Sequence, residues 1–230
     1  MKIINNRIDF KNYIQIAGII DTIEAEMLIQ LGIKYLGFPL RLPVNKEDLT
    51  EKEAGDIIRK LKPPVQSVII SYSETADEAI ELCRKTGASI IQLHGGIDLD
   101  EVKRIKDQSI NVIKSLVITD NNEEELNGLI RELESEVDAF ITDTYDPVSG
   151  ASGATGKTHD WNVSKKFVEL SSKPVILAGG LNPDNVYDAI IKVRPSGVDV
   201  HTGIEDIKGR KDKFLTKRFI DEARRAFAKI

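Results

Sequence analysis

The stretch IQIAGIID, from Ile14 to Asp21, has the pattern of a strand that runs directly into a helix. Ile14 and Ile16 belong to a short β-branched run, which is typical of a buried strand. Asp21 is followed three residues later by Glu24, a near variant of the capping box at which many helices begin. We therefore expect one strand and one helix here, joined by a short loop.

The same unit recurs along the chain. Short apolar runs begin about 20 to 35 residues apart, and the segments between them carry apolar residues at helical spacing. Thr50 and Thr75 each precede a glutamate by three residues, and Gly32 and Gly87 follow helical segments. The eight strand candidates are Ile14–Ile16, Tyr35–Phe38, Val65–Ile70, Ile90–Leu93, Val112–Leu116, Ala139–Thr142, Val175–Leu177 and Val198–Val200.

Regular alternation of strands and helices predicts a parallel sheet with right-handed crossovers. Eight such units in 230 residues predict an α/β fold, the closed (β/α)8 TIM barrel, because these barrels take about 200 to 250 residues. No linker divides the chain, so we expect a single domain over residues 1–230. We expect residues 1–12, which precede the first strand, to form a short N-terminal extension across the bottom of the barrel.

Composition excludes several classes of protein. The net charge of −5 arises from 32 basic and 37 acidic residues that are interspersed, which disfavours binding to nucleic acid. The single cysteine, Cys83, excludes a disulfide framework, and its helical position directs it into the core. No apolar run approaches the roughly 18 residues of a membrane span, and the start lacks a secretion signal. We expect a soluble, cytoplasmic protein.

In a TIM barrel the functional groups lie on the loops after the strands, and phosphate is often bound after the seventh and eighth strands. The seventh strand candidate ends in LAGGLNPDNV, where Gly179 and Gly180 allow the backbone to approach a ligand. The eighth ends in VDVHTGIED, where Thr202 and Gly203 lead into another short segment. Each pair alone could form an ordinary tight turn. Together, at these two loops, they predict a phosphate-binding site.

The longest connection, TDTYDPVSGASGATGKTHDW, runs from Thr142 to Trp161. Its GATGKT segment does not match the nucleotide-binding loop, because Ala151 stands where that motif requires its first glycine. We expect a lid over the mouth of the barrel, in which Gly153 and Gly156 permit closure and Lys157 reaches an anion. A surface loop without function is the alternative.

Two residues at strand ends are candidates for the chemistry. Asp143, after the sixth strand, is a candidate general acid if burial raises its pKa, although it could also brace the loop. His94, in QLHGG, forms a polar wall of the pocket or is a structural histidine. His94, His159 and His201 lie far apart in sequence without zinc-ligand spacing, so we expect no metal. Asp199 points either into the barrel or towards the helices.

Four segments in this order and spacing, QLHGG, FITDTYDPVSGASGATGKTHDW, LAGGLNPDNV and VDVHTGIED, resemble the phosphoribosylanthranilate isomerase family of tryptophan biosynthesis. The resemblance spans about residues 14–227. It implies an Amadori rearrangement of an aminoaldose phosphate to an aminoketose phosphate, without cofactor or metal. An acid protonates the ribose ring oxygen, the ring opens to a Schiff base, and a base removes the C2 proton.

The resemblance also implies roles for individual residues. Asp143 corresponds to the general acid of the family. The phosphate-binding loops correspond to Gly179, Gly180, Thr202 and Gly203, and the lid contains Gly153, Gly156 and Lys157.

The chain departs from the family in two places. The first strand of the family usually carries a cysteine that acts as general base, and Ala17 occupies that position here. A methyl group cannot accept a proton. After the second strand the family carries a basic segment that contacts the anthranilate carboxylate; here Arg41 and Lys46 are available, and Arg41 is the candidate contact.

Loss of a general base costs about 10²- to 10⁴-fold in rate, so another residue must replace it if the reaction survives. Asp21, Asp9 and Tyr72 are the replacements that the sequence offers. The main hypothesis is a divergent isomerase that acts on a small phosphorylated substrate as a monomer or homodimer. The alternatives are a catalytically silent barrel that binds or senses a sugar phosphate, and a related enzyme with another phosphorylated ligand.

Overall fold

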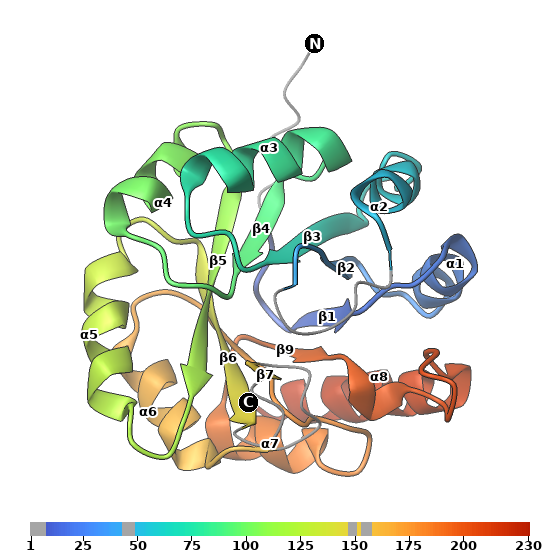
Figure 1. Cartoon of the computed structure of the whole chain (residues 1–230). Helices are drawn as coiled ribbons and strands as arrows, with labels where there is room; N and C mark the ends of the chain where they lie inside the picture. Colours follow the sequence, from blue (N-terminus) through green and yellow to red (C-terminus); the bar gives the residue numbers. More distant parts are fainter. Residues whose placement is uncertain (1–7, 43–48, 147–150, 153–157) are drawn as a thin grey trace.

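The chain folds into a closed ring of parallel strands surrounded by helices (Figure 1). The computed structural model describes residues 8–42, 49–146, 151–152 and 158–230. The barrel strands are β1 (Tyr13–Ala17), β2 (Tyr35–Pro39), β3 (Gln66–Ser71), β4 (Ile90–Leu93), β5 (Asn111–Ile118), β6 (Ala139–Asp146), β8 (Val175–Leu177) and β9 (Gly197–Val200). The helices are α1 (Thr22–Gln30), α2 (Glu51–Ile58), α3 (Ala76–Thr86), α4 (Leu99–Lys106), α5 (Glu123–Leu133), α6 (Trp161–Leu170), α7 (Val186–Val193), the 3₁₀ helix η1 (Thr202–Ile204) and α8 (Lys213–Phe227).

Pairing between β5 and β6 completes the ring. The order of the strands is β5-β4-β3-β2-β1-β9-β8-β6, and each neighbour in this order is parallel. The closing pair aligns Ile113 with Ala139, also in parallel. The predicted (β/α)8 barrel is therefore confirmed, with all eight strand candidates in place.

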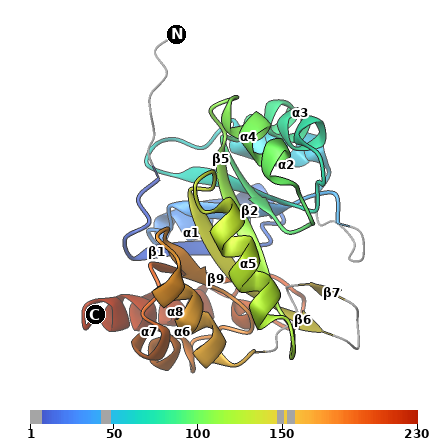
Figure 2. The same cartoon turned by 90° about the vertical axis from the view of Figure 1, so that its left-hand side faces the viewer.

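One strand lies outside the ring. The short strand β7 (Ala151–Ser152) pairs antiparallel with the end of β6, as Figure 2 shows from the side. This pairing occurs within the predicted lid. It accounts for the extension of β6 to Asp146, four residues beyond the Thr142 at which the sequence pattern ends.

The barrel has two hydrophobic layers because successive residues of a strand face opposite sides of the sheet. The inner cluster fills the bottom of the ring with residues such as Tyr13, Ile90, Ile113 and Ile141, and Ile8 packs against it. The outer layer lies between the strands and the surrounding helices. Cys83 is buried in this outer layer, as predicted.

Above the inner cluster the inward positions become polar. Each of four polar residues lies two positions after an inner-layer residue of the same strand. They are Gln15 after Tyr13, Gln92 after Ile90, Asp143 after Ile141 and Asp199 after Gly197. A period of two keeps each pair on the same side of the sheet. The apolar floor of the barrel therefore gives way to a polar layer at the carboxyl ends of the strands.

Local sequence signals account for the boundaries of several helices. Thr50 and Glu53 form the predicted capping box of α2, and Asp21 accepts a hydrogen bond from Glu24 N at 2.8 Å at the start of α1. Gly87 ends α3 with a φ of 86°, a conformation that favours glycine. Within the described ranges, no helix combines the length and apolarity needed to cross a membrane.

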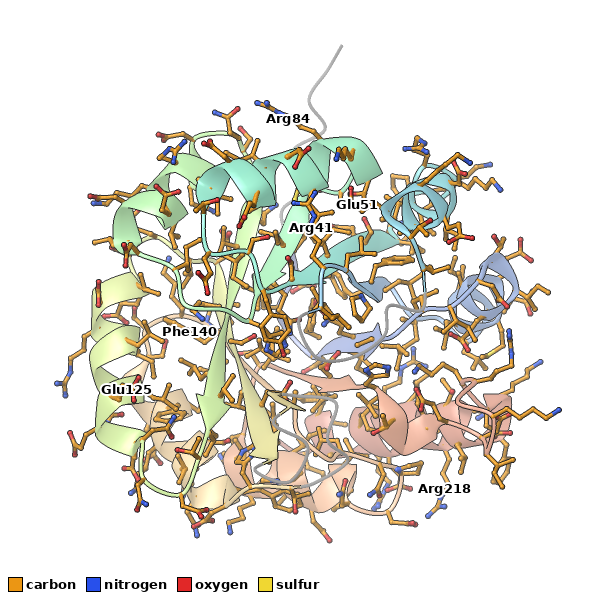
Figure 3. The ribbon with its side chains drawn as sticks, viewed as in Figure 1. Arg41, Glu51, Arg84, Glu125, Phe140 and Arg218 are labelled. Atoms are coloured by element: carbon orange, nitrogen blue, oxygen red, sulfur yellow. The ribbon has the colours of Figure 1, made fainter. Side chains whose placement is uncertain are left out.

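We predict that Phe140→Ala lowers the free energy of unfolding by about 3–5 kcal/mol, because it leaves a cavity in the outer layer. Phe140 is fully buried on β6 (Figure 3). The matched control is Phe214→Ala on α8, where the side chain is 73% exposed; we expect a change within about 0.5 kcal/mol. Denaturant titration measures both, and equal effects would contradict the assigned packing.

Candidate active site

A small pocket at the carboxyl ends of β6, β8 and β9 brings together residues from distant parts of the sequence. Asp143 contributes one wall, and the loops after β8 and β9 contribute the others. Its described lining is Asp143, Gly179, Gly180, Leu181, Asp199, Val200, His201, Thr202 and Gly203. The candidate acid and the four glycine and threonine residues of the predicted phosphate loops thus share one pocket.

The two loops lie so close together that side chains would keep them apart. A Cβ atom on Gly203 would lie 1.9 Å from the carbonyl oxygen of Leu181 in the other loop. Gly179 has a φ of 93°, and a Cβ there would lie 2.3 Å from Thr144 Oγ1. These contacts require glycine at both positions. They leave backbone, rather than side chains, facing the pocket.

Side chains behind the pocket hold the loop after β8 in place. Asn185 accepts a hydrogen bond from Asn182 N at 2.8 Å and donates one to Gly180 O at 3.0 Å.

His159 lies between Thr144 and Ser164. Its Nδ1 is 2.9 Å from Thr144 Oγ1, and its Nε2 is 2.5 Å from Ser164 Oγ. With both ring nitrogens engaged, His159 braces β6 against α6.

The loop after β9 is fixed by ion pairs. Lys211 Nζ lies 2.5 Å from Glu205 Oε1, and Lys211 N donates to Glu24 Oε1 at 2.8 Å. Arg210 pairs with Asp21 at 2.7 Å. Burial raises the pKa of Asp21, but hydrogen bonds from Glu24 N and Arg210 outweigh it and the net shift is downward. Asp21 therefore caps a helix and holds the loop.

Asp143 lies at the end of β6 and is buried. Its Oδ1 accepts a hydrogen bond from Thr144 N at 2.7 Å, and its Oδ2 lies 3.7 Å from His94 Nε2. Burial raises the pKa of Asp143 to about 7, even though the hydrogen bond from Thr144 acts in the opposite direction. A carboxyl with this pKa is partly protonated near neutral pH, so it can donate a proton.

His94 is neutral, and a chain of hydrogen bonds through the barrel determines its tautomer. Tyr13 OH donates to Gln15 Oε1 at 2.6 Å, and Gln15 Nε2 donates to Gln92 Oε1 at 2.9 Å. Gln92 Nε2 then lies 3.0 Å from His94 Nε2, which must accept from this amide. Burial and the charge of Lys114 lower the pKa of His94 to about 3. The proton is therefore on Nδ1, a buried atom with no partner among the described residues.

Asp199, whose direction the sequence left open, faces the barrel interior. It lies beside Gln15 in the register of β1 and β9 and lines the same pocket as Asp143. Burial and the charge of Asp143 raise the pKa of Asp199 to about 8, against a hydrogen bond from Gln15 and the charge of Lys211. The pocket thus contains two buried carboxyl groups of raised pKa.

Three residues of this site were missed from the sequence. Gln15 and Gln92 interrupt apolar strands at inward positions, and an amide within such a run is the signal that could have identified them. Lys114 is buried in β5 and donates to the carbonyl oxygens of Leu93 and Gly95, at 3.3 and 3.0 Å. Burial lowers its pKa to about 8. Lys114 thereby fixes the loop that carries His94.

Ala17 lies at the end of β1 and is buried. The adjacent Gly18 is covered by the imidazole of His201: a Cβ on Gly18 would lie 2.0 Å from His201 Nε2. His201 Nε2 also lies 3.5 Å from Glu205 Oε1. Burial and the charge of Lys211 lower the pKa of His201 to about 3. Position 17 therefore carries no proton acceptor, and a neutral histidine covers the adjacent Gly18.

Other candidates from the sequence lie elsewhere. The guanidinium of Arg41 pairs with Glu51 at 2.7 Å and Glu81 at 3.1 Å, and Figure 3 shows Arg41 beside Glu51. To bind a substrate carboxylate, Arg41 would have to exchange these partners. Asp9 precedes β1 at the opposite end of the barrel, where its carboxylate accepts from Lys11 N. Its distance from the pocket excludes it as a replacement base.

Tyr72 lies near the candidate acid. Its ring stacks on His94 with 5.2 Å between centroids, and burial together with the charge of Asp143 raises its pKa to about 12. It therefore keeps its proton at neutral pH. The predicted lid residues Gly153, Gly156 and Lys157, together with Lys46, lie outside the described residues.

Acid–base chemistry is what this arrangement supports. Two buried carboxyl groups, a neutral histidine and two glycine loops surround one small space. Among the residues that the structure describes, no three histidine, cysteine, aspartate or glutamate side chains are grouped so that they could hold a metal ion. The geometry favours proton transfer on a small molecule whose anionic end contacts backbone.

Comparisons with known proteins identify the family. The family model described as N-(5'phosphoribosyl)anthranilate (PRA) isomerase matches residues 16–222. N-(5'-phosphoribosyl)anthranilate isomerase 2 of Methanosarcina mazei is 34% identical over 220 residues, which cover 94% of this chain and 96% of the relative.

Solved structures agree with this match. The dimeric phosphoribosylanthranilate isomerase of Thermotoga maritima, solved as monomers, has a TM-score of 0.78 and 28% identity, covering 93% of this chain and 98% of that chain. Another phosphoribosylanthranilate isomerase, in complex with reduced 1-(o-carboxyphenylamino)-1-deoxyribulose 5-phosphate, has a TM-score of 0.77 and 27% identity, with the same coverage. On the strength of the matched family model and the curated relative, this chain belongs to the N-(5'-phosphoribosyl)anthranilate isomerase family.

Proposed function

We propose that this protein catalyses the Amadori rearrangement of N-(5'-phosphoribosyl)anthranilate to the aminoketose phosphate in tryptophan biosynthesis. The reaction is an intramolecular isomerisation of an aldose to a ketose. One observation carries the proposal: the buried carboxyl of Asp143, with its pKa raised to about 7, lines the same pocket as the glycine loops after β8 and β9. Family membership supplies the substrate.

The phosphate of the substrate binds at the two glycine loops. Gly179, Gly180, Thr202 and Gly203 line the pocket, and the contact between Gly203 and Leu181 O keeps side chains out of it. Backbone N–H groups at such a loop suit an anion because they donate hydrogen bonds without the desolvation cost of burying a further charge. The position of the bound phosphate therefore determines how far the sugar extends towards Asp143.

Asp143 acts as the general acid. In its protonated form it donates to the ribose ring oxygen, which opens the ring to a Schiff base. His94 presents its Nδ1–H, a buried donor without a partner in the described part of the chain, as a hydrogen bond to a substrate oxygen. A neutral imidazole in this role orients the sugar without competing for the proton of Asp143.

The proposal allows a monomer or a homodimer, and a homodimer would contain two such sites. The reaction needs neither cofactor nor metal, because proton transfers alone convert substrate to product. We place the protein in the cytoplasm, with a small phosphorylated molecule as its only required partner.

We predict that the wild-type protein consumes phosphoribosylanthranilate, followed by loss of substrate fluorescence, and that Asp143→Asn lowers kcat by about 10²- to 10⁴-fold. Asparagine keeps the shape of the side chain but cannot donate an acidic proton. Glu74→Gln, a matched carboxylate-to-amide change at an exposed position, serves as the control and leaves kcat unchanged. Tight binding of inorganic phosphate without any turnover by the wild type would instead indicate a silent barrel.

The pH dependence of the reaction follows from Asp143. Its pKa is raised to about 7, so the protonated form that donates is lost as the pH rises through that value. We expect kcat/KM to fall by about tenfold for each pH unit well above 7. In Asp143→Asn the residual rate should not show this alkaline limb; a limb of the same shape in the variant would exclude Asp143 as its source.

We predict that Gly203→Ala raises KM by about tenfold to a hundredfold, because the new methyl group must push the loop away from Leu181 O and displace the phosphate. Gly128→Ala on α5 is the matched control, since no atom lies within 4 Å of its added Cβ. Steady-state kinetics and thermal melting of both variants measure the effect. Unchanged KM in Gly203→Ala would mean that the phosphate binds elsewhere.

A further inference from the structure

The proposed rearrangement requires a group that removes the C2 proton, and Ala17 cannot do so. This inference rests on the proposed function and concerns the identity of that base. Among the replacements considered from the sequence, Asp9 lies at the other end of the barrel, Asp21 is paired with Arg210, and Tyr72 retains its proton. The base must therefore be sought among the side chains that line the pocket.

Asp199 has the required position. It projects inward from β9, lies beside Gln15 on β1, and shares the pocket with Asp143 and the phosphate loops. On the inward face of β1, Ala17 is two residues beyond Gln15 towards the mouth. A carboxylate at 199 and a side chain at 17 therefore approach the same space from neighbouring strands.

Asp199 also has an unused acceptor. Its Oδ1 atom is buried and has no hydrogen-bond partner among the described residues. A buried carboxyl oxygen left unpaired is costly, and a ligand in the pocket would supply the missing partner. No other described carboxylate contributes an unpaired buried oxygen.

We propose that Asp199 is the general base that removes the C2 proton, so that Asp143 and Asp199 form an acid–base pair of two carboxyl groups in place of an acid and a thiolate. The pair shares one proton at neutral pH, since two close carboxylates cannot both ionise in a buried site.

The proton balance of the reaction closes on this pair. Asp143 gives its proton to the ring oxygen as the bond from that oxygen to C1 breaks, and the nitrogen lone pair forms the C1=N bond. Asp199 takes the proton from C2, and the C–H electrons form C1=C2 while the C=N electrons return to nitrogen. The enolamine becomes the ketone by moving the proton of its C2 hydroxyl to C1. One proton leaves the pair and one returns.

The electrostatic surroundings of Asp199 agree with this role. The charge of Asp143 raises the pKa of Asp199 in addition to burial, while Gln15 and Lys211 oppose the shift. Tyr13, below it in the barrel, is protonated, because burial and the charge of Asp199 raise its pKa. His201, on the pocket side, is neutral. A carboxylate with a raised pKa is a stronger base than an ordinary one. Because the pKa of Asp199, about 8, lies above that of Asp143, about 7, the reactive form of the pair is the fraction in which the shared proton lies on Asp143.

His201 is the competing candidate, since its ring covers Gly18 beside Ala17. However, burial and the charge of Lys211 lower its pKa to about 3, which makes the imidazole a weak base for a carbon-bound proton. Its Nε2 is also turned towards Glu205. The observations therefore favour Asp199, and the experiment includes both residues.

The test measures steady-state turnover of phosphoribosylanthranilate by three variants. They are Asp199→Asn, His201→Gln, and a double variant that combines Ala17→Cys and Asp199→Asn in one chain. We expect Asp199→Asn to lower kcat by about 10²- to 10⁴-fold with little change in KM, and His201→Gln to lower it by less than about tenfold. In the double variant a thiolate again supplies the base, so kcat should recover by at least about tenfold over Asp199→Asn. A merely structural role of Asp199 would not produce this rescue.

Failure of the inference and failure of the proposed function give different results. Wild-type-like kcat in Asp199→Asn, a larger loss in His201→Gln, or no rescue by Ala17→Cys would each overturn the role of Asp199 while the wild type still turns over substrate. An inactive wild type would overturn the function itself. Thermal melting verifies that each variant is folded, and Asp199→Ser replaces Asp199→Asn if the latter does not fold.

Discussion

The burial of two carboxyl groups at one end of the barrel is the constraint on which the rest of the site depends. Asp143 and Asp199 face inward from β6 and β9, and desolvation disfavours the charge on both. A protein tolerates such groups where they are neutral or hydrogen-bonded, and rigid surroundings keep them from turning towards solvent. The chain of hydrogen bonds from Tyr13 to His94 and the contacts of Lys114 supply this rigidity from below and from the side.

The two ends of the pocket are built by different means. At one end the backbone approaches closely, because Gly179 and Gly203 replace side chains where the end of β6 meets the loops after β8 and β9. At the other end, side chains of opposite tendency are combined: carboxyl groups that resist ionisation and histidines that resist protonation. Ala17 at the end of β1 leaves the first of these ends untouched. In the proposed reaction it changes only which group accepts the C2 proton.

Much of the fold and part of the site could be predicted from particular sequence features. The apolar runs located all eight barrel strands, and Thr50 with Glu53 located the start of α2, because these signals depend on residues near one another in sequence. Asp143, Gly179, Gly180, Thr202 and Gly203 were found because strand ends of a barrel meet at one face. Arg41 could not be placed in this way, since its partners Glu51 and Glu81 come from two helices whose contact depends on the completed barrel.

The sequence by itself therefore determined the number of βα units, their order and the loops that line the pocket, since these follow from periodicity and from the conformational needs of glycine and capping residues. Only the tertiary structure decided which face of β9 points inward, and with it the position of Asp199. A period of two assigns alternate residues to opposite faces but does not say which face is the interior. Closure of the ring through β5 and β6 makes that choice, and the same closure creates the desolvated space that raises the pKa of both carboxyl groups.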